Sequence, residues 1–133
     1  MSSAHPRTIL ITGASAGIGK ATVARFVAEG WTVAATMRKP DTFGAPSGPG
    51  RAKAFALDVT DQVSIARALA AIESDLGGIG VLVNNAGYGL VGPFEAIDEA
   101  QIRRQFETNV FGLMAVTRAV LPGMRARCSG RIL

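Results

Sequence analysis

A glycine-rich segment constrains this chain more than any other feature: residues 12–19 read Thr-Gly-Ala-Ser-Ala-Gly-Ile-Gly. It follows the apolar residues 8–11 and opens a helix-like run over residues 20–29. A strand, a glycine turn and a helix in this order leave unpaired N–H groups at the positive end of the helix dipole, where an anion such as a pyrophosphate fits. The spacing G-x-x-x-G-x-G differs from the commoner phosphate-binding fingerprints. Alone, it is equally consistent with a nucleotide site and with a merely tight turn.

The rest of the chain repeats the alternation of apolar runs and helical periodicity. We expect Gly30 to end the first helix, Thr60 to cap the second and Gly77 to stop it. Residues 40–51 are rich in proline and glycine, so this crossover should be short or irregular. Strands are predicted at 7–12, 32–36, 52–57 and 80–83.

The last third predicts a loop, a long helix and the start of a strand. Residues 88–97 form a loop with apolar side chains, and Asp98 or Glu99 begins the helix. Residues 110–121 are apolar nearly all round, which predicts burial on more than one side. Pro122 should kink or break the helix, and residues 131–133 open another strand.

Alternating strands and helices predict an α/β fold with a parallel sheet and right-handed crossovers. We expect a doubly wound Rossmann-type sheet with strand order 3-2-1-4 and the start of a fifth strand, incomplete at its end, within a single domain over residues 1–133. Ligands bind such sheets beyond the carboxyl ends of the strands. The glycine turn, Arg38, Asp58 and residues 84–87 all fall at those ends.

Composition excludes several classes of protein. An apolar fraction of 48% with 18% charged residues is typical of a globular chain. Neither a membrane span nor a secretory leader is expected, and a single cysteine, Cys128, fits a reducing cytoplasm. We assign no metal site and give Cys128 and His5 no role. The net charge of +4 admits nucleic acid, a phosphorylated cofactor or a solvated basic face; scattered charges with few aromatics argue against nucleic acid.

Four motifs in order resemble the short-chain dehydrogenase/reductase family over residues 7–133. They are Thr-Gly-x-x-x-Gly-x-Gly at 12–19, Leu-Asp-Val-Thr at 57–60, Asn-Asn-Ala-Gly at 84–87 and Asn-Val-Phe-Gly at 109–112. The resemblance implies an enzyme that transfers hydride between a nicotinamide and a small carbonyl or alcohol substrate, usually as a homo-oligomer.

The resemblance also implies roles for individual residues. The turn would cradle the cofactor pyrophosphate, two residues would meet the adenine, three would line the path from ribose to nicotinamide, and an asparagine would hold a water in a proton relay by kinking its helix. The turn residues for the pyrophosphate are Gly13, Ser15, Ala16, Gly17, Ile18 and Gly19. The adenine residues are Asp58 and Val59, and the residues between ribose and nicotinamide are Asn85, Ala86 and Gly87. The asparagine of the proton relay is Asn109.

Each of these assignments has a structural alternative. Asn84 and Asn85 are open to a purely structural role, because buried amides often satisfy loop carbonyls. Asp58 is also consistent with a turn residue before a helix. Asn109 lies in an apolar helix, where a core hydrogen bond alone would explain a polar side chain.

The end of the second predicted strand bears on the choice of cofactor. An NAD site there needs a carboxylate for the ribose 2′-hydroxyl, but the chain has Met37, followed by Arg38 and Lys39. Methionine does not repel a 2′-phosphate, and the two cations can neutralise it. We therefore favour NADP(H) over NAD(H). A guanidinium of Arg38 stacked on adenine is the alternative, and it suits both cofactors.

The proton-transfer residues that the family uses are missing from the chain. The only tyrosine is Tyr88, with Gly92 four residues later, so neither Tyr-x-x-x-Lys nor the preceding serine is present. We expect the chain to be truncated before them and not to turn over. Elements that would cover residues 110–121 are missing too, and the uncovered apolar face should favour association or instability.

Three classes of function therefore remain at this point. The first is the cofactor-binding half of an oxidoreductase. The second is a non-catalytic NADP-binding module or truncated gene product. The third is a nucleic-acid or interaction protein that uses its basic face. The apolar loop at 88–97 hints at a hydrophobic substrate but is equally explained by local packing.

Overall fold

The computed structural model describes residues 6–133; residues 1–5, His5 among them, lie outside the described part. Short 3₁₀ turns occur at Pro40–Thr42 and Phe94–Ala96, and a π-helical segment spans Glu107–Gly112. The strands are β1 (Thr8–Ile11), β2 (Thr32–Met37), β3 (Arg51–Ala56), β4 (Val81–Val83) and β5 (Arg131–Ile132). The helices are α1 (Gly17–Ala28), α2 (Gln62–Leu76), α3 (Glu99–Phe106) and α4 (Leu113–Ala126).

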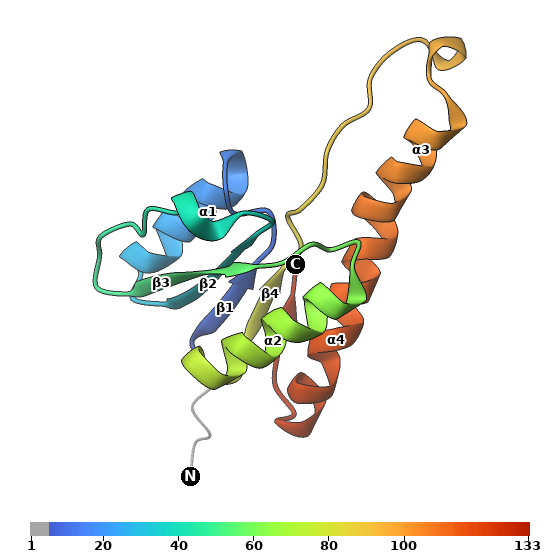
Figure 1. Cartoon of the computed structure of the whole chain (residues 1–133). Coiled ribbons are helices and arrows are strands. Elements are labelled where there is room, and N and C mark those ends of the chain that lie inside the picture. Colours follow the sequence, from blue (N-terminus) through green and yellow to red (C-terminus); the bar gives the residue numbers. More distant parts are fainter. Residues whose placement is uncertain (1–5) are drawn as a thin grey trace.

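The five strands form one parallel sheet in the order β3-β2-β1-β4-β5. This confirms the predicted order 3-2-1-4 and places the fifth strand beside β4. Helix α1 covers one face of the sheet, while α2 and α4 cover the other (Figure 1). The chain therefore has the doubly wound arrangement that places loops from several strands at one end of the sheet.

The central strand β1 shows why both faces are covered. Ile9 and Ile11 are fully buried in a cluster with Val23 and Val27 of α1. Leu10, between them, is fully buried in the opposite cluster with α2 and α4. Successive side chains of a strand point to opposite faces, so an uninterrupted apolar run requires apolar packing on both sides.

The predicted helix ends are confirmed where the signals are strong. Gly30 adopts φ +78° just after α1, and the amide of Trp31 donates to the Phe26 carbonyl at 3.0 Å, which closes the helix end. Gly77 follows α2 with φ +85°. Asp98 caps α3 in a reciprocal pair of hydrogen bonds with Gln101.

The predicted cap of α2 is wrong by one residue. The carboxylate of Asp61 accepts hydrogen bonds from the amides of Val63 at 2.9 Å and Ser64 at 3.2 Å, so Asp61 is the N-cap. Thr60 instead donates its hydroxyl and its amide to Asp58. Threonine and aspartate can both cap a helix. Here the hydroxyl and amide of Thr60 are bonded to the Asp58 carboxylate, so Asp61 is left to cap α2.

The helix around Pro122 also departs from expectation. Helix α4 runs through Pro122, so the predicted break does not occur, and Val120 and Met124, on either side of it, are buried in the core shared with α2. Burial of residues 110–121 is one-sided: Phe111 is 54% and Met114 46% exposed. With α3 and the π-helical segment, α4 forms a rod that extends beyond the sheet (Figure 1). Among the described residues, no helix is both long and apolar enough to span a bilayer.

Candidate functional site

A cavity of about 600 Å³ lies at the carboxyl ends of β1, β2, β3 and β4. It gathers most of the residues selected from the sequence, although they come from four separate stretches of chain. The selected residues that line it are Gly13, Ser15, Ala16, Gly17, Ile18, Arg38, Asp58, Val59, Asn85, Ala86 and Gly87. Gly19 and Asn109 do not line it and lie behind its walls.

The glycine turn at the base of this cavity presents backbone amides. Gly13 has φ +65° and Gly17 has φ +55°, conformations that side chains rarely adopt. The N-cap of α1 is Ala16, and within residues 6–133 no side chain caps this helix and no acidic residue lies in its first turn. The N-terminal amides of α1 therefore lack the usual capping acceptor and are suited to an anion.

Gly19 allows α1 to pack against the turn. A Cβ atom at this position would lie 2.3 Å from the Gly13 carbonyl oxygen and 2.5 Å from Nδ2 of Asn85. Both distances are far below contact distance, so only glycine fits. Gly19, predicted to cradle the pyrophosphate with the rest of the turn, therefore packs one step behind the cavity surface.

Asn85 and Thr12 connect the glycine turn to the end of β4. Nδ2 of Asn85 donates to the carbonyls of Thr12 and Gly13, both at 3.0 Å. The hydroxyl of Thr12 accepts from the amides of Asn85 at 3.0 Å and Ala86 at 2.9 Å. The structural role left open for Asn85 is therefore present, and the residue also lines the cavity.

The neighbouring Asn84 lies on the other side of the strand end. Its Nδ2 donates to the hydroxyl of Thr117 in α4 at 3.1 Å. This contact connects β4 to the helix that packs on it and lies outside the cavity lining. This contact supports the purely structural role that the sequence left open for Asn84.

Asp58 lies in a tight turn at the end of β3. Its Oδ1 accepts from the hydroxyl of Thr60 at 2.7 Å and from the Thr60 amide at 2.9 Å. The hydroxyl bond, then the amide bond, and finally the charge of Arg38 hold the pKa of Asp58 below its ordinary value of 3.8, against the opposing effect of partial burial. Asp58 is therefore ionised at neutral pH, and it combines a turn role with a place in the cavity wall.

We expect the variant Asp58→Asn to be less stable than the native chain at neutral pH, by an amount that shrinks in acid. Because folding lowers the pKa of this carboxyl, its contribution is complete above 3.8 and disappears as the pH falls through the folded-state value. Urea unfolding of both proteins, at neutral pH and in acid, measures the difference. A difference independent of pH would contradict this account.

Asn109 lies in the π-helical segment and binds the backbone of Tyr88. Its Oδ1 accepts from the Tyr88 amide at 3.0 Å, and its Nδ2 donates to the Tyr88 carbonyl at 2.8 Å. Segments of π-helix are frequent at functional sites. These hydrogen bonds are exposed, so they are not the core hydrogen bond of the structural alternative, and they hold a loop that lines the cavity.

Several lining residues were not selected from the sequence as site residues. They are Met37, Leu57, Thr60, Tyr88 and Thr108. Met37 was considered only for the carboxylate that it lacks, and Leu57 only as the last residue of a predicted strand and the first of a family motif. Thr108 precedes Asn109, where the resemblance implied a kinked helix, but which side of the helix faces the cavity depends on the extent of the π-helical segment.

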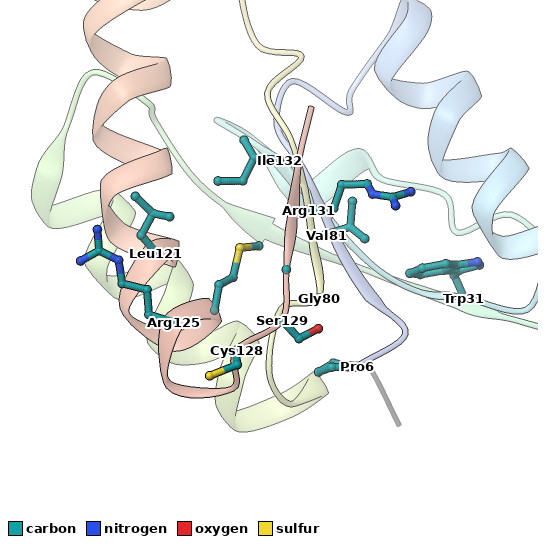
Figure 2. Close-up of a pocket in the computed structure, with 12 residues that line it drawn as sticks. Pro6, Trp31, Gly80, Val81, Leu121, Arg125, Cys128, Ser129, Arg131 and Ile132 are labelled. Atoms are coloured by element: carbon teal, nitrogen blue, oxygen red, sulfur yellow. The ribbon is translucent and has the colours of Figure 1, made fainter. Parts of the chain in front are cut away.

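A second, larger cavity of about 740 Å³ lies at the opposite end of the sheet. It is lined by Pro6, Gly80 and residues 128–132, which precede or form the amino ends of strands, and by side chains of α4 such as Leu121 (Figure 2). It contains none of the residues selected from the sequence. Ligand sites of doubly wound sheets lie at the carboxyl ends, so we favour the first cavity. Within residues 6–133, no cluster of three or more metal-ligating side chains occurs.

Comparisons with known proteins agree with this geometry. A family model described as short chain dehydrogenase matches residues 7–133. The chain is 39% identical over 129 residues to a 3-ketodihydrosphingosine reductase of Bacteroides thetaiotaomicron, covering 97% of this chain and 46% of the relative. It is 41% identical over 140 residues to human retinol dehydrogenase 8, covering 98% and 44%.

Solved structures show the same fold. A serine dehydrogenase in its closed form, complexed with NADP⁺, superposes with a TM-score of 0.82 at 34% identity, covering 94% of this chain and 52% of that one. The chain spans a little under half of the length of the curated relatives that it matches.

Proposed function

The chain belongs to the short-chain dehydrogenase family, and on this premise we propose that it is the NADP(H)-binding half of an oxidoreductase. The reaction class is hydride transfer between a nicotinamide and a carbonyl or alcohol carbon. The relatives include a reductase of a sphingoid ketone and a retinol dehydrogenase, and a serine dehydrogenase is among the structural neighbours. We therefore propose no substrate narrower than a small-molecule carbonyl or alcohol.

The observation that carries this proposal is the cavity at the carboxyl ends of the strands. Its volume of about 600 Å³ lies within the range of small-molecule sites. Its centre is the turn before α1, its β2 and β3 side holds Arg38 and Asp58, and its β4 side holds residues 85–88. An elongated ligand with a negatively charged middle fits this distribution.

The glycine turn would bind the pyrophosphate. The amides at the start of α1 are free of side-chain caps within the described residues, and the helix dipole adds to their attraction for an anion. Ser15, Ala16 and Ile18 line this part of the cavity, and Ser15 adds a hydroxyl donor. Gly19 keeps the helix close enough for the turn to hold this shape.

The β2 and β3 side would bind the adenosine half. The Asp58 carboxylate is ionised at neutral pH, and both hydrogen bonds from Thr60 go to its Oδ1, so Oδ2 would accept from an amino group. Arg38 is exposed at the end of β2 and lines the cavity, where it would pair with a 2′-phosphate. Met37, 5% exposed, offers no carboxylate to a ribose hydroxyl. These features favour NADP(H) over NAD(H).

The β4 side would then bind the nicotinamide half, since the sheet order places β4 and β3 on opposite sides of β1. When bound, the nicotinamide supplies the hydride. The chain's own residues orient it: Asn85 fixes the loop to the glycine turn, and Asn109 fixes the same loop at Tyr88.

A non-catalytic NADP-binding module is the second candidate function. The 133 residues contain one tyrosine and no Tyr-x-x-x-Lys pair, so we propose that this chain binds cofactor without turnover. Consumption of NADPH in the presence of carbonyl compounds by the purified chain would contradict the proposed inactivity and leave the cofactor site intact.

A fluorescence titration with NADPH and NADH tests the cofactor site directly. We expect saturable binding of NADPH to the folded chain and weaker binding of NADH. Circular dichroism and cooperative urea unfolding of the same sample establish that it is folded. A folded sample without affinity for either dinucleotide would overturn the proposed function.

A further inference from the structure

Two side chains hold the backbone of Tyr88 from the same direction. Asn109 satisfies both its amide and its carbonyl. Gln105, in the last turn of α3, adds a further bond: its Nε2 donates to the Tyr88 carbonyl at 3.2 Å. The two side-chain amides converge on one carbonyl, whose two lone pairs can accept both.

This carbonyl lies in an irregular loop. Residues 84–91 have no regular secondary structure, and the tyrosine is 45% exposed. At the start of the loop, Asn85 and Ala86 are bonded to the glycine turn. At Tyr88, the described hydrogen bonds come from Gln105 and Asn109 alone. The wall of the cavity is therefore fixed at two points, and α3 supplies part of the second.

The geometry points to Gln105 as a positioning residue for the β4 side of the dinucleotide site. Gln105 does not line the cavity; it acts through the Tyr88 carbonyl, which holds residues 85–88 in place. This inference rests on the proposed function, because it assigns that wall to the nicotinamide half. The adenosine half would be bound by Arg38, Asp58 and the glycine turn, to which Gln105 makes no described hydrogen bond.

Because Gln105 is assigned to the nicotinamide side alone, its role can be tested by comparing NADPH with 2′,5′-ADP. The variant Gln105→Leu keeps helix propensity and removes the donor. It should weaken NADPH binding roughly three- to tenfold, the effect of one net hydrogen bond. Binding of 2′,5′-ADP, which lacks the nicotinamide half, should not change. Arg104→Leu is the matched control, because Arg104 is an exposed neighbour on α3 and should leave both affinities unchanged.

The possible outcomes separate this inference from the proposed function. If the native chain binds neither ligand, the proposed function fails. If it binds both and Gln105→Leu weakens neither or both equally, the positioning role is wrong. Gln105→Met, which keeps the side-chain length, is measured alongside and should show the same split. Loss of cooperative unfolding in both variants would assign Gln105 a purely structural role and would also overturn the inference.

Discussion

Gly19→Ala should destabilise the chain and weaken the binding of NADPH, although alanine is the better helix former. The new Cβ would lie 2.3 Å from the Gly13 carbonyl oxygen and 2.5 Å from Nδ2 of Asn85. One of these atoms is backbone, which no rotamer change can move. The other donates to the carbonyls of Thr12 and Gly13, so displacing it breaks two hydrogen bonds.

The sizes of the opposing contributions indicate that Gly19→Ala lowers the free energy of unfolding. Alanine in place of glycine favours a helix interior by about 1 kcal/mol. Overpacking costs about 1–3 kcal/mol, and two lost hydrogen bonds add about 1 kcal/mol each. We expect the free energy of unfolding to fall by about 2–4 kcal/mol, measured as a lower urea midpoint. The glycine turn must move to accept the methyl group, so NADPH affinity should fall at least about tenfold, in a site that depends on its shape.

Gly44→Ala is the matched control. A Cβ at Gly44 meets no atom within 4 Å, and the residue lies in the irregular crossover before β3. It should leave NADPH affinity unchanged and leave stability unchanged or slightly higher. Equal stabilities of Gly19→Ala and Gly44→Ala would show that α1 can move away from the turn at little cost.

The sequence was sufficient for those parts of the fold where local signals and topology agree. Gly30 and Gly77 have no competing interpretation as helix ends, and both are confirmed. The strand order followed from alternation and handedness. The cap of α2 was missed by one residue, because Thr60 and Asp61 are both good caps and only the position of the Asp58 carboxylate distinguishes them.

The long-range contacts of the loop after β4 could not be predicted from the sequence. The bond between Gln105 and Tyr88 joins residues 17 positions apart, across a loop whose path no periodicity fixes. Thr108 reaches the cavity through the π-helical segment, which changes the register of the helix faces. The one-sided burial of α4 depends in the same way on which elements pack against it, not on its own composition.

Arg38→Glu should weaken NADPH binding roughly a hundredfold and NADH binding by less than about threefold. Arg38 is exposed beside the cavity at the end of β2, and its charge acts on Asp58 nearby. Reversal removes charge-assisted bonds to a 2′-phosphate, which contribute about 1.5–3 kcal/mol, and adds repulsion between two anions. NADH lacks that phosphate, so its affinity depends on the glycine turn and Asp58.

A control variant and the salt dependence distinguish a direct contact of Arg38 with the 2′-phosphate from an effect of the protein's overall charge. Arg104→Glu makes the same change of charge on α3, outside the cavity lining, so it should alter both affinities little. Because Arg38 is exposed, the hundredfold loss should shrink as salt screens the charges. Equal losses of NADPH and NADH affinity in Arg38→Glu would instead identify a guanidinium stacked on the adenine, and the preference for NADP(H) would have no remaining support at this position.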